Sequence, residues 1–336
     1  MLLAGVVSRS TRCVLVDEKK ETKKQKGTLS AAALSFQDAG RSESTKRAYK
    51  SDWADFSDWC AHNDEDPLPA SDIAVANYVA YIASGDGAKK STVTRRVAAI
   101  NKQHEMAGYA RPGRSTEVAQ VVAGVRRSLG SDIDKARPFG RAALLLALNG
   151  LDDSNLRDVR DKAVLLLGFA CALRRSEIVS ILVEDLTFEE GSGVLLSIPV
   201  SKTDQERAGH LVAMPYAKEQ TLCPVRALES WLQLSKVRDG ALFRGVLKNG
   251  EVRSTAMNPG SVNDIIKRAA NKAGVLNPEE YSGHSLRAGF VTDAREAGVP
   301  DHLIMRTTRH KDPRTLSGYD RPAMLLENTA FGWAGW

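Results

Sequence analysis

Cysteine is scarce in this chain, and the few cysteines stand far apart. Cys13, Cys60, Cys171 and Cys223 include no CxxC pair. Zinc clusters and disulfide frameworks depend on close or regular cysteine spacing, so we expect neither. The pattern fits a reducing compartment. We therefore expect a soluble, cytoplasmic protein, associated with the nucleoid if its host is prokaryotic.

Long hydrophobic runs are missing as well. The longest apolar stretch, residues 163–173, is shorter than the ~20 residues that a helix needs to cross a bilayer. The apolar start, residues 1–7, is shorter than the apolar core of a secretory signal and has no basic region before it. We expect no membrane span and no membrane partner.

Motifs for nucleotide and metal chemistry are also lacking. The chain has no GxxxxGK[ST] loop for a nucleoside triphosphate, and no acidic cluster suggests a two-metal site. Gly85-Asp86-Gly87 lacks a third glycine, because Lys90 stands at that position. We therefore expect neither a metal ion nor a cofactor.

What the chain does contain is a modest excess of positive charge, on a length that suits two domains. It has 336 residues, a net charge of +6 and a pI near 9.1, which suits a polyanionic partner. We predict a flexible basic tail over residues 1–28, a helical domain over 29–132, a linker over 133–139 and a second domain over 140–336.

Helical periodicity dominates the first domain. One segment, capped by Ser42 or Ser44, carries apolar residues at helical spacing, namely Tyr49, Trp53, Phe56 and Cys60. A second, capped by Ser71, is expected to bury Ile73, Ala76, Val79 and Ile82. Two further segments, near 93–100 and 118–129, complete the pattern of a small helical bundle.

Charge is unevenly divided within this bundle. Residues 51–72 hold seven acids and no Lys or Arg, whereas residues 87–137 hold eleven basic residues and four acids. Charges on helices often only cover a solvated face, but this segregation favours a surface that contacts DNA phosphates. The residues predicted to touch DNA are Lys89, Lys90, Arg95, Arg96, Arg126 and Arg127.

The second domain mixes helical and strand patterns. Helices are predicted over 142–148, 161–173, 223–234, 259–273, 284–297 and 301–307. Short strands are predicted over 186–188, 194–200 and 211–214, the first two joined by the turn Gly191-Ser192-Gly193. The predicted fold class is mainly α with a small antiparallel β-sheet, in two domains.

Two arginine motifs suit the binding of an oxyanion. Arg174 and Glu177, three apart in ALRRSEI, share a face if helical, and Glu177 can then orient the guanidinium toward a phosphate. An ordinary surface ion pair would give the same pattern, but the apolar run before Arg174 places it near the core. His284 and Arg287, three apart in SGHSLRAG, lie on one face of a helix whose N-terminus also favours an anion.

A lysine, a histidine and a tyrosine complete the set. Lys202 lies in SKTDQERAG between two predicted strands, where most lysines are simply solvated; as a functional group it would protonate a leaving oxygen. Between His310 and Tyr319, Asp312-Pro313 predicts the start of a short helix. We therefore place His310 in a loop and Tyr319 on or after that helix. A tyrosine packed at a helix end is the ordinary alternative.

In order and spacing, ALRRSEI, SKT, SGHSLRAG and H-x8-Y resemble the motifs of the tyrosine recombinases, the integrase family that includes the Cre and Xer recombinases. SGHSLRAG in particular is similar to the Cre motif. The resemblance covers residues 140–336 and, less specifically, the helical bundle. It implies a scissile phosphate surrounded by Arg174, Lys202, His284, Arg287 and His310, with Tyr319 as the nucleophile and Glu177 as an acid behind them.

The resemblance also implies the activity and the architecture. The family is a set of site-specific recombinases that cleave and rejoin DNA through a covalent phosphotyrosine, without metal or ATP. Its members form a C-shaped clamp, with a helical core-DNA-binding domain on one side of double-stranded DNA and the catalytic domain on the other. The C-terminal segment 322–336, which holds Leu325, Phe331 and Trp336, would dock into a neighbouring protomer to build a homotetramer on two duplexes.

Three positions depart from the family pattern. Ala172 and Arg309 stand where glycine is frequent, and Arg175 occupies a slot that is normally apolar. Two other functions share much of this set of residues and stay open at this point. One is a type IB topoisomerase or telomere resolvase, and the other is a non-catalytic DNA-binding protein on the same fold.

Overall fold

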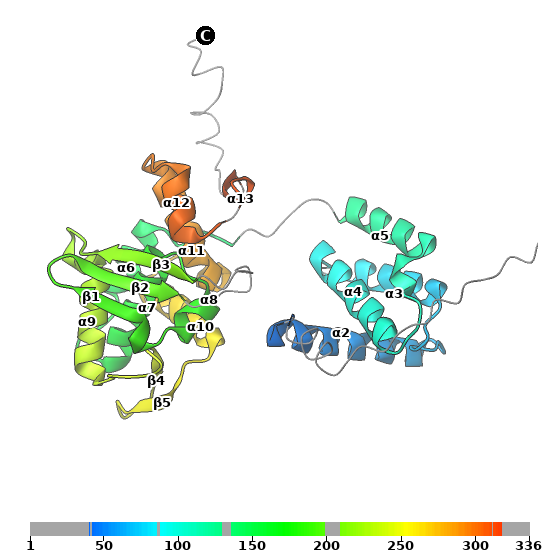
Figure 1. The fold of residues 1–336 in the computed structure, drawn as a ribbon, viewed down its shortest axis with the longest axis horizontal. Helices are drawn as coiled ribbons and strands as arrows, with labels where there is room; N and C mark the ends of the chain where they lie inside the picture. The colour runs from blue at the N-terminus through cyan, green and yellow to red at the C-terminus, as the bar shows by residue number, and fades with distance from the viewer. Residues whose placement is uncertain are drawn as a thin grey trace, which may run out of the picture. The chain divides into compact units, whose positions relative to one another are not determined.

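The computed structural model describes residues 40, 42–85, 88–129, 136–198, 209–310 and 312–317. The chain divides between residues 131 and 132 into two compact units, each with its own hydrophobic core (Figure 1). Lys202, Tyr319, the tail 1–28 and the segment 322–336 lie outside the described ranges. The clamp arrangement of the two units stays a prediction.

The first unit is a helical bundle, as the periodicity predicts. Its elements are α2 (Glu43–His62), α3 (Asp72–Ser84), α4 (Lys90–Met106), the 3-10 helix η1 (Pro112–Arg114) and α5 (Thr116–Ser128). Ser42, Ser71 and Ser115 cap α2, α3 and α5, because each side-chain oxygen accepts the backbone N–H three residues further on. Of the two predicted caps for α2, the structure selects Ser42.

The core of the bundle is built mainly by α2, α3 and α4, around Phe56, Tyr78 and Ile100. The prediction that α3 buries Ile73 is wrong, since that side chain is 65% exposed. The residues that α3 buries are Ala74, Val75, Tyr78 and Val79. Because apolar residues occupy most positions of α3, its sequence does not single out one face.

Acids of α2 pair with arginines of α4 inside this unit. The Arg96 guanidinium binds both carboxylate oxygens of Asp55, with Nη1–Oδ1 at 2.6 Å, and Tyr78 donates to the same Oδ1 at 2.6 Å. Arg95 Nη2 lies 3.2 Å from an oxygen of Asp52. Part of the charge segregation seen in the sequence therefore joins the two helices.

The second unit is mostly helical. Its helices are α6 (Arg141–Asn149), α7 (Leu156–Ala170), α8 (Arg175–Ser180), η2 (Val183–Asp185), η3 (Gln220–Leu222), α9 (Pro224–Ser235), α10 (Pro259–Lys272), η4 (Pro278–Glu280), α11 (Gly283–Glu296), α12 (Asp301–Thr308) and α13 (Arg314–Ser317). The predicted helices are present, but α7 begins five residues earlier than expected, behind Asn155, and ends at Ala170.

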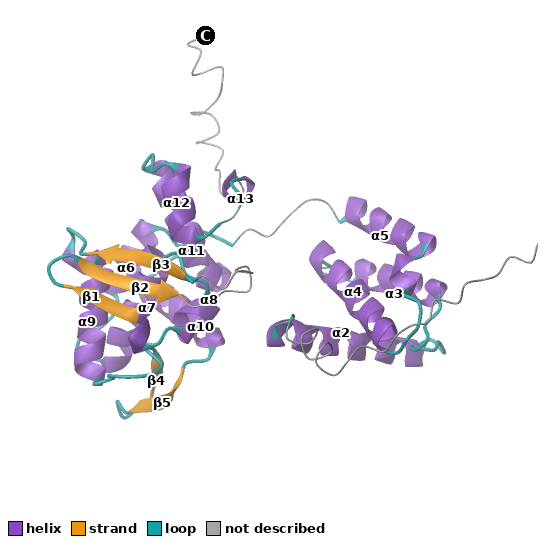
Figure 2. Cartoon of the chain, in the orientation of Figure 1, coloured by secondary structure: helices purple, strands orange, loops and turns teal. Residues whose placement is uncertain are grey.

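Three antiparallel strands form a sheet on this unit (Figure 2). They are β1 (Leu186–Glu189), β2 (Gly193–Ile198) and β3 (His210–Pro215), in the order β1-β2-β3, with Leu186 opposite Leu196 and Ile198 opposite His210. This sheet agrees with the three predicted strands. A second hairpin, β4 (Arg244–Val246) with β5 (Val252–Ala256), was not predicted.

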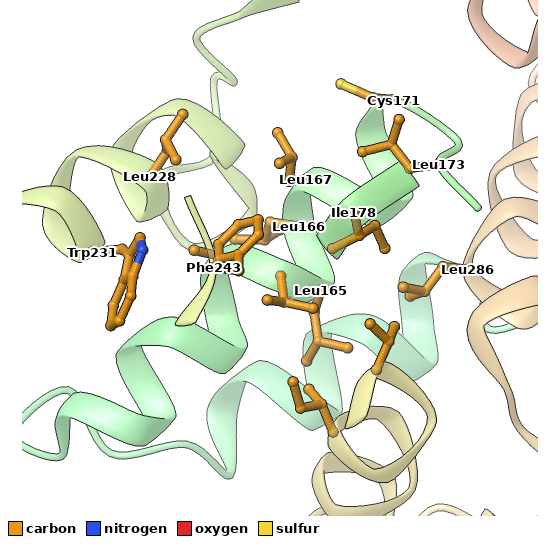
Figure 3. Packing of buried hydrophobic residues seen from close by; sticks show 14 of the residues in the cluster. Leu165, Leu166, Leu167, Cys171, Leu173, Ile178, Leu228, Trp231, Phe243 and Leu286 are labelled. Carbon is orange, nitrogen blue, oxygen red and sulfur yellow. The ribbon is translucent and has the colours of Figure 1, made fainter. Parts of the chain in front are cut away.

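The core of the second unit centres on α7, whose Leu165, Leu166 and Leu167 lie among side chains of α8, α9 and α11 (Figure 3). Trp231 of α9 is fully buried, and its indole N–H donates to the Leu242 carbonyl at 2.9 Å. Ile178 of α8 and Leu286 of α11 belong to the same core. This packing fixes the starts of α8 and α11, which carry the arginine motifs. Over the described ranges, no helix has the length and apolar character required to span a membrane.

Candidate active site

The first predicted arginine, Arg174, follows a tight turn at the end of α7. The N–H of Leu173 donates to Gly168 and the N–H of Ala172 to Phe169, each at 3.0 Å, which is the Schellman pattern of a helix C-terminus. Ala172 takes the left-handed conformation that this turn requires, with φ of 47°. The glycine usual at this position is thus replaced by the smallest chiral residue, and the turn directs Arg174 to the start of α8.

Glu177 holds Arg174 in place. Arg174 is the N-cap of α8 and not a helical residue, so the two side chains meet through the cap rather than along a helix face. The Arg174 Nη1 donates to Glu177 Oε1 at 2.7 Å, and the Arg174 backbone N–H donates to Oε2 at 2.8 Å. Burial raises the pKa of Glu177, but Arg309 and Arg174 outweigh it, so the pKa is lowered and the carboxylate stays charged.

Replacing Glu177 with alanine is expected to lower the free energy of unfolding of the second unit by about 3–5 kcal/mol, since it breaks a buried ion pair and leaves Arg309 without its carboxylate. The urea midpoint of this unit measures the loss. Glu279, whose side chain is 79% exposed and pairs with Lys267, provides the control, and Glu279→Ala should change stability by less than about 1 kcal/mol. Equal effects of the two substitutions would contradict the assignment.

His284 and Arg287 lie on α11, which starts behind Ser282 as predicted. Arg287 is only 3% exposed, and its Nη1 donates to the Ala172 carbonyl at 2.8 Å. The turn that positions Arg174 therefore also holds Arg287. The Arg287 guanidinium thus binds the backbone turn that leads into Arg174, whose own guanidinium is held by Glu177.

Two glycines of SGHSLRAG permit close packing around this point. A Cβ on Gly283 would lie 2.7 Å from the Cβ of Arg175, so the starts of α8 and α11 approach closely only because this residue has no side chain. A Cβ on Gly289 would overlap the Phe139 carbonyl oxygen. Asn263 of α10 completes the approach by accepting the Gly283 N–H at 2.8 Å.

His310 lies just after α12, outside any helix, as predicted. Its Nδ1 is 3.0 Å from the Thr308 hydroxyl, which itself lies 2.8 Å from the Ile304 carbonyl. A hydroxyl has one proton, and here it donates to the carbonyl. We infer that Nδ1 of His310 carries a proton and donates to Thr308, which makes Nε2 the basic nitrogen of the neutral ring.

The surroundings of both histidines favour the neutral ring. Burial, with the charges of Arg287, Arg174 and Arg309, lowers the pKa of His310 to about 4. Burial, with the charges of Arg287, Arg174 and Arg175, lowers the pKa of His284 below its ordinary value. Arg287 and Arg174 act on both rings, so the structure brings Arg174, His284, Arg287 and His310 into one site where α8, α11 and α12 meet (Figure 1).

The predicted DNA-contacting residues lie on the first unit in several settings. Lys90 and Arg95 of α4 line a depression of about 700 Å³ together with Thr45 and Tyr49 of α2. The Arg96 guanidinium binds the carboxylate of Asp55, whereas the Arg126 guanidinium donates to the Thr94 hydroxyl at 3.3 Å. Lys89 and Arg127 are exposed.

Sequence reasoning did not assign roles to Thr308, Arg309 or Asn263. The Thr308 hydroxyl lies against Nδ1 of His310, and Asn263 binds the first N–H of α11. Arg309 contacts Glu177 through Nη2 at 2.7 Å. The only sequence signal for these roles is the departure from glycine at position 309.

These features define a class of protein. Two buried or half-buried guanidinium groups, one bound by Glu177 and one by the Ala172 carbonyl, lie beside two imidazoles with lowered pKa values. Together they form a preorganised receptor for an oxyanion that also contains proton acceptors. That arrangement is typical of enzymes that transfer a phosphoryl or phosphodiester group.

The model of the Phage integrase family matches residues 142–325. The chain is 37% identical over 305 residues to an integrase/recombinase XerD homolog of Selenomonas ruminantium, covering 90% of this chain and 88% of the relative. It is 27% identical over 265 residues to the Cre recombinase of Escherichia phage P1, covering 74% and 75%. The chain therefore belongs to the phage integrase family.

Solved structures share the fold. A lambda integrase fragment bound to a core site superposes with a TM-score of 0.57 at 16% identity, covering 85% of this chain and 91% of the fragment. The Tn1549 transposon integrase in complex with circular-intermediate DNA gives a TM-score of 0.58 at 15% identity, covering 90% and 96%. The predicted fold class, mainly α with a small antiparallel sheet, is confirmed.

Proposed function

We propose that this member of the family is a site-specific DNA recombinase that cleaves and rejoins strands through a covalent phosphotyrosine on Tyr319. The observation that carries the proposal is the turn at Ala172, which leads directly into Arg174 and whose carbonyl binds the Arg287 guanidinium. Curated relatives over most of the chain are named recombinases and integrases, which favours this activity over a topoisomerase or a pure DNA-binding protein.

Cleavage begins with attack of the Tyr319 hydroxyl oxygen on phosphorus. A tyrosine with pKa ~10 is about one part in a thousand phenolate at neutral pH, so the site must accept its proton and favour negative charge. The neutral ring of His310 or His284 can accept the proton. Arg174 and Arg287 bind the non-bridging oxygens, whose negative charge grows as the fifth bond to phosphorus forms.

The sugar oxygen then leaves, and Lys202 is the residue that we expect to protonate it. One P–O bond forms as another breaks, so the energy of the phosphodiester is retained in the phosphotyrosine. Attack by a sugar hydroxyl on that linkage reverses the step and releases Tyr319. Rejoining therefore needs neither ATP nor metal.

We propose double-stranded DNA with a specific recombination site as the substrate, contacted on the first unit by the depression between α2 and α4. Lys90 at the start of α4 adds its charge to the positive end of the helix, and Arg95 lies one turn further on. Lys89, Arg126 and Arg127 are the further phosphate contacts that we expect, with Arg96 serving mainly to join α4 to α2. A cytoplasmic location stays our expectation.

The C-terminal segment 322–336 is proposed to join protomers into a homotetramer. Deleting residues 327–336 is expected to leave binding to a single DNA site intact and to abolish the pairing of two sites, because Phe331, Trp333 and Trp336 would no longer reach a neighbour. Gel-shift titration separates the single-site complex from the paired complex. Recombination at the full rate by the truncated protein would overturn this proposal.

The test of the proposed activity is to sequence DNA that becomes covalently trapped on the protein in cells and to map the attached peptide. A recombinase yields one recurring sequence, attached at Tyr319. A relaxation assay on supercoiled DNA without that sequence separates the alternative, because a type IB topoisomerase relaxes it whereas a site-specific enzyme does not. Adducts scattered over unrelated sequences, together with efficient relaxation, would contradict the proposal.

A further inference from the structure

Arg309 occupies a backbone position that suits glycine. It ends α12 in the left-handed conformation, with φ of 60° and ψ of 35°. This conformation costs free energy in any residue with a Cβ, and glycine is the usual solution at a helix C-terminus. An arginine here implies that its side chain does something that offsets the cost.

The Arg309 side chain is buried and contacts three separate parts of the chain. It is only 4% exposed, and Nη2 lies 2.7 Å from Glu177 Oε2. Nη1 donates to the carbonyls of Cys171 at 3.2 Å and of Thr307 at 3.0 Å. One planar guanidinium thus joins α8, the turn after α7 and the end of α12, and a lysine has no comparable fork.

Each of these contacts leads directly to a residue of the candidate site. Glu177 uses its other oxygen to bind Arg174. Arg309 donates a hydrogen bond to the Cys171 carbonyl, and the next carbonyl, that of Ala172, accepts a hydrogen bond from the Arg287 guanidinium. His310 is the next residue in the chain. The Arg309 guanidinium is therefore linked to each of the two arginines through one intermediate contact, and the backbone of Arg309 continues directly into His310.

Arg309 also changes the charge balance of the site. Glu177 carries one negative charge beside the positive charges of Arg174 and Arg287, so these three groups alone sum to about +1. With Arg309 they sum to about +2, because its charge compensates that of Glu177. An attacked phosphodiester goes from one negative charge to nearly two, and the second positive charge is then available where negative charge develops.

We propose that Arg309 is a positioning residue of DNA cleavage, which clamps Glu177 and the 171–172 turn so that Arg174, Arg287 and His310 are held in one arrangement. This inference rests on the proposed function, since it concerns the same site. Arg309 acts through other residues and is not itself assigned a contact with DNA. The arrangement is expected in the protein before DNA binds.

Three variants of the full-length protein test the proposal. Arg309→Gly removes the clamp and suits the backbone, Arg309→Met keeps the volume without the charge, and Arg309→Lys keeps the charge without the fork. Lys236→Gly is the matched control. Lys236 ends α9 in the same left-handed conformation, with φ of 59°, and is exposed. This control relieves the same backbone cost and leaves the site unchanged.

Cleavage is measured in a single turnover, as covalent adduct formed on a nicked duplex carrying the sequence recovered from trapped DNA. Arg309→Gly and Arg309→Met are expected to slow adduct formation by about 10²-fold, the order of loss that follows small displacements of catalytic groups. Arg309→Lys should recover part of the rate, and Lys236→Gly should match the unmodified protein. DNA affinity should be similar in all four variants.

A second readout needs no DNA and separates positioning from general folding. NMR titration of the His310 ring reports its pKa, which burial lowers to about 4 together with the charges of Arg287, Arg174 and, least of the three, Arg309. Loss of the Arg309 charge should raise this pKa measurably in Arg309→Gly and Arg309→Met, while burial, Arg287 and Arg174 keep it below 6.5. It should stay low in Arg309→Lys and Lys236→Gly.

The proposal is overturned if Arg309→Gly and Arg309→Met form the adduct at the unmodified rate. It is also overturned if the pKa of His310 does not move in either variant, since Arg309 would then lie away from the site. Failure of the proposed function looks different. In that case the unmodified protein forms no adduct at Tyr319, while the NMR titration still reports whether Arg309 acts on His310.

Discussion

Tyr319→Phe is expected to abolish the covalent protein–DNA adduct and to leave DNA affinity unchanged. The substitution removes one oxygen atom, which is the nucleophile of the proposed reaction, and phenylalanine has no group that can attack phosphorus. DNA affinity depends mainly on basic side chains that contact phosphates, and these are untouched. Adducts are resolved from free DNA on a denaturing gel, and affinity is measured by a gel shift at fixed salt.

Tyr281 offers a matched control for this experiment. It is 4% exposed, precedes the start of α11 and packs edge-on against Phe139. Tyr281→Phe also removes a tyrosine hydroxyl near the site but should still form the adduct. An adduct from the Tyr319→Phe protein would show that another residue is the nucleophile. If the unmodified protein formed no adduct, the alternative of a non-catalytic DNA-binding protein on this fold would be favoured.

Replacing Arg287 is expected to give the second large effect, a fall in the rate of cleavage of about 10²–10³-fold. Arg287→Ala removes one of the two guanidinium groups proposed to bind the non-bridging oxygens, but it also leaves a cavity at a site that is 3% exposed. Arg287→Lys keeps the charge and most of the volume and loses only the fork. Both variants should be slow, and only the alanine variant should be markedly less stable.

Single-turnover adduct formation and the thermal midpoint are the two measurements for Arg287. Arg295, two turns further along α11, donates to the Leu316 carbonyl at 3.0 Å and provides the control. Arg295→Lys should cleave at the unmodified rate. If Arg287→Lys were as fast as Arg295→Lys, the planar guanidinium would be unnecessary and the proposed role of Arg287 would be wrong.

The helices of this protein could be predicted because apolar spacing and capping residues agree. Ser71 and Ser282 precede α3 and α11 as predicted. The hairpin of β4 and β5 was missed although Asn249-Gly250, a favourable turn pair, separates its strands. Its strands have three and five residues and include Arg244, Arg253 and Ser254, so apolar alternation is too weak to identify them.

The residues of the candidate site could be named from motifs, but their supports could not. Arg174 and Glu177 lie in one short motif, and His284 and Arg287 lie in another, so local geometry makes each pair neighbours. The contact between Arg309 and Glu177 joins residues 132 positions apart, and no local pattern encodes it. Glycine is frequent in the family at positions 172 and 309. The structure gives the reason, because the backbone is left-handed at both residues.

The missing side chain at Gly283 has a consequence for anyone who alters this protein. One added methyl group would meet Arg175 and force apart the two helices that present the cationic groups. The absence of a side chain at residue 283 thus sets how closely the starts of α8 and α11 approach, and with it the distance between the cationic groups that they carry. Libraries that aim at new target sequences should leave this position alone.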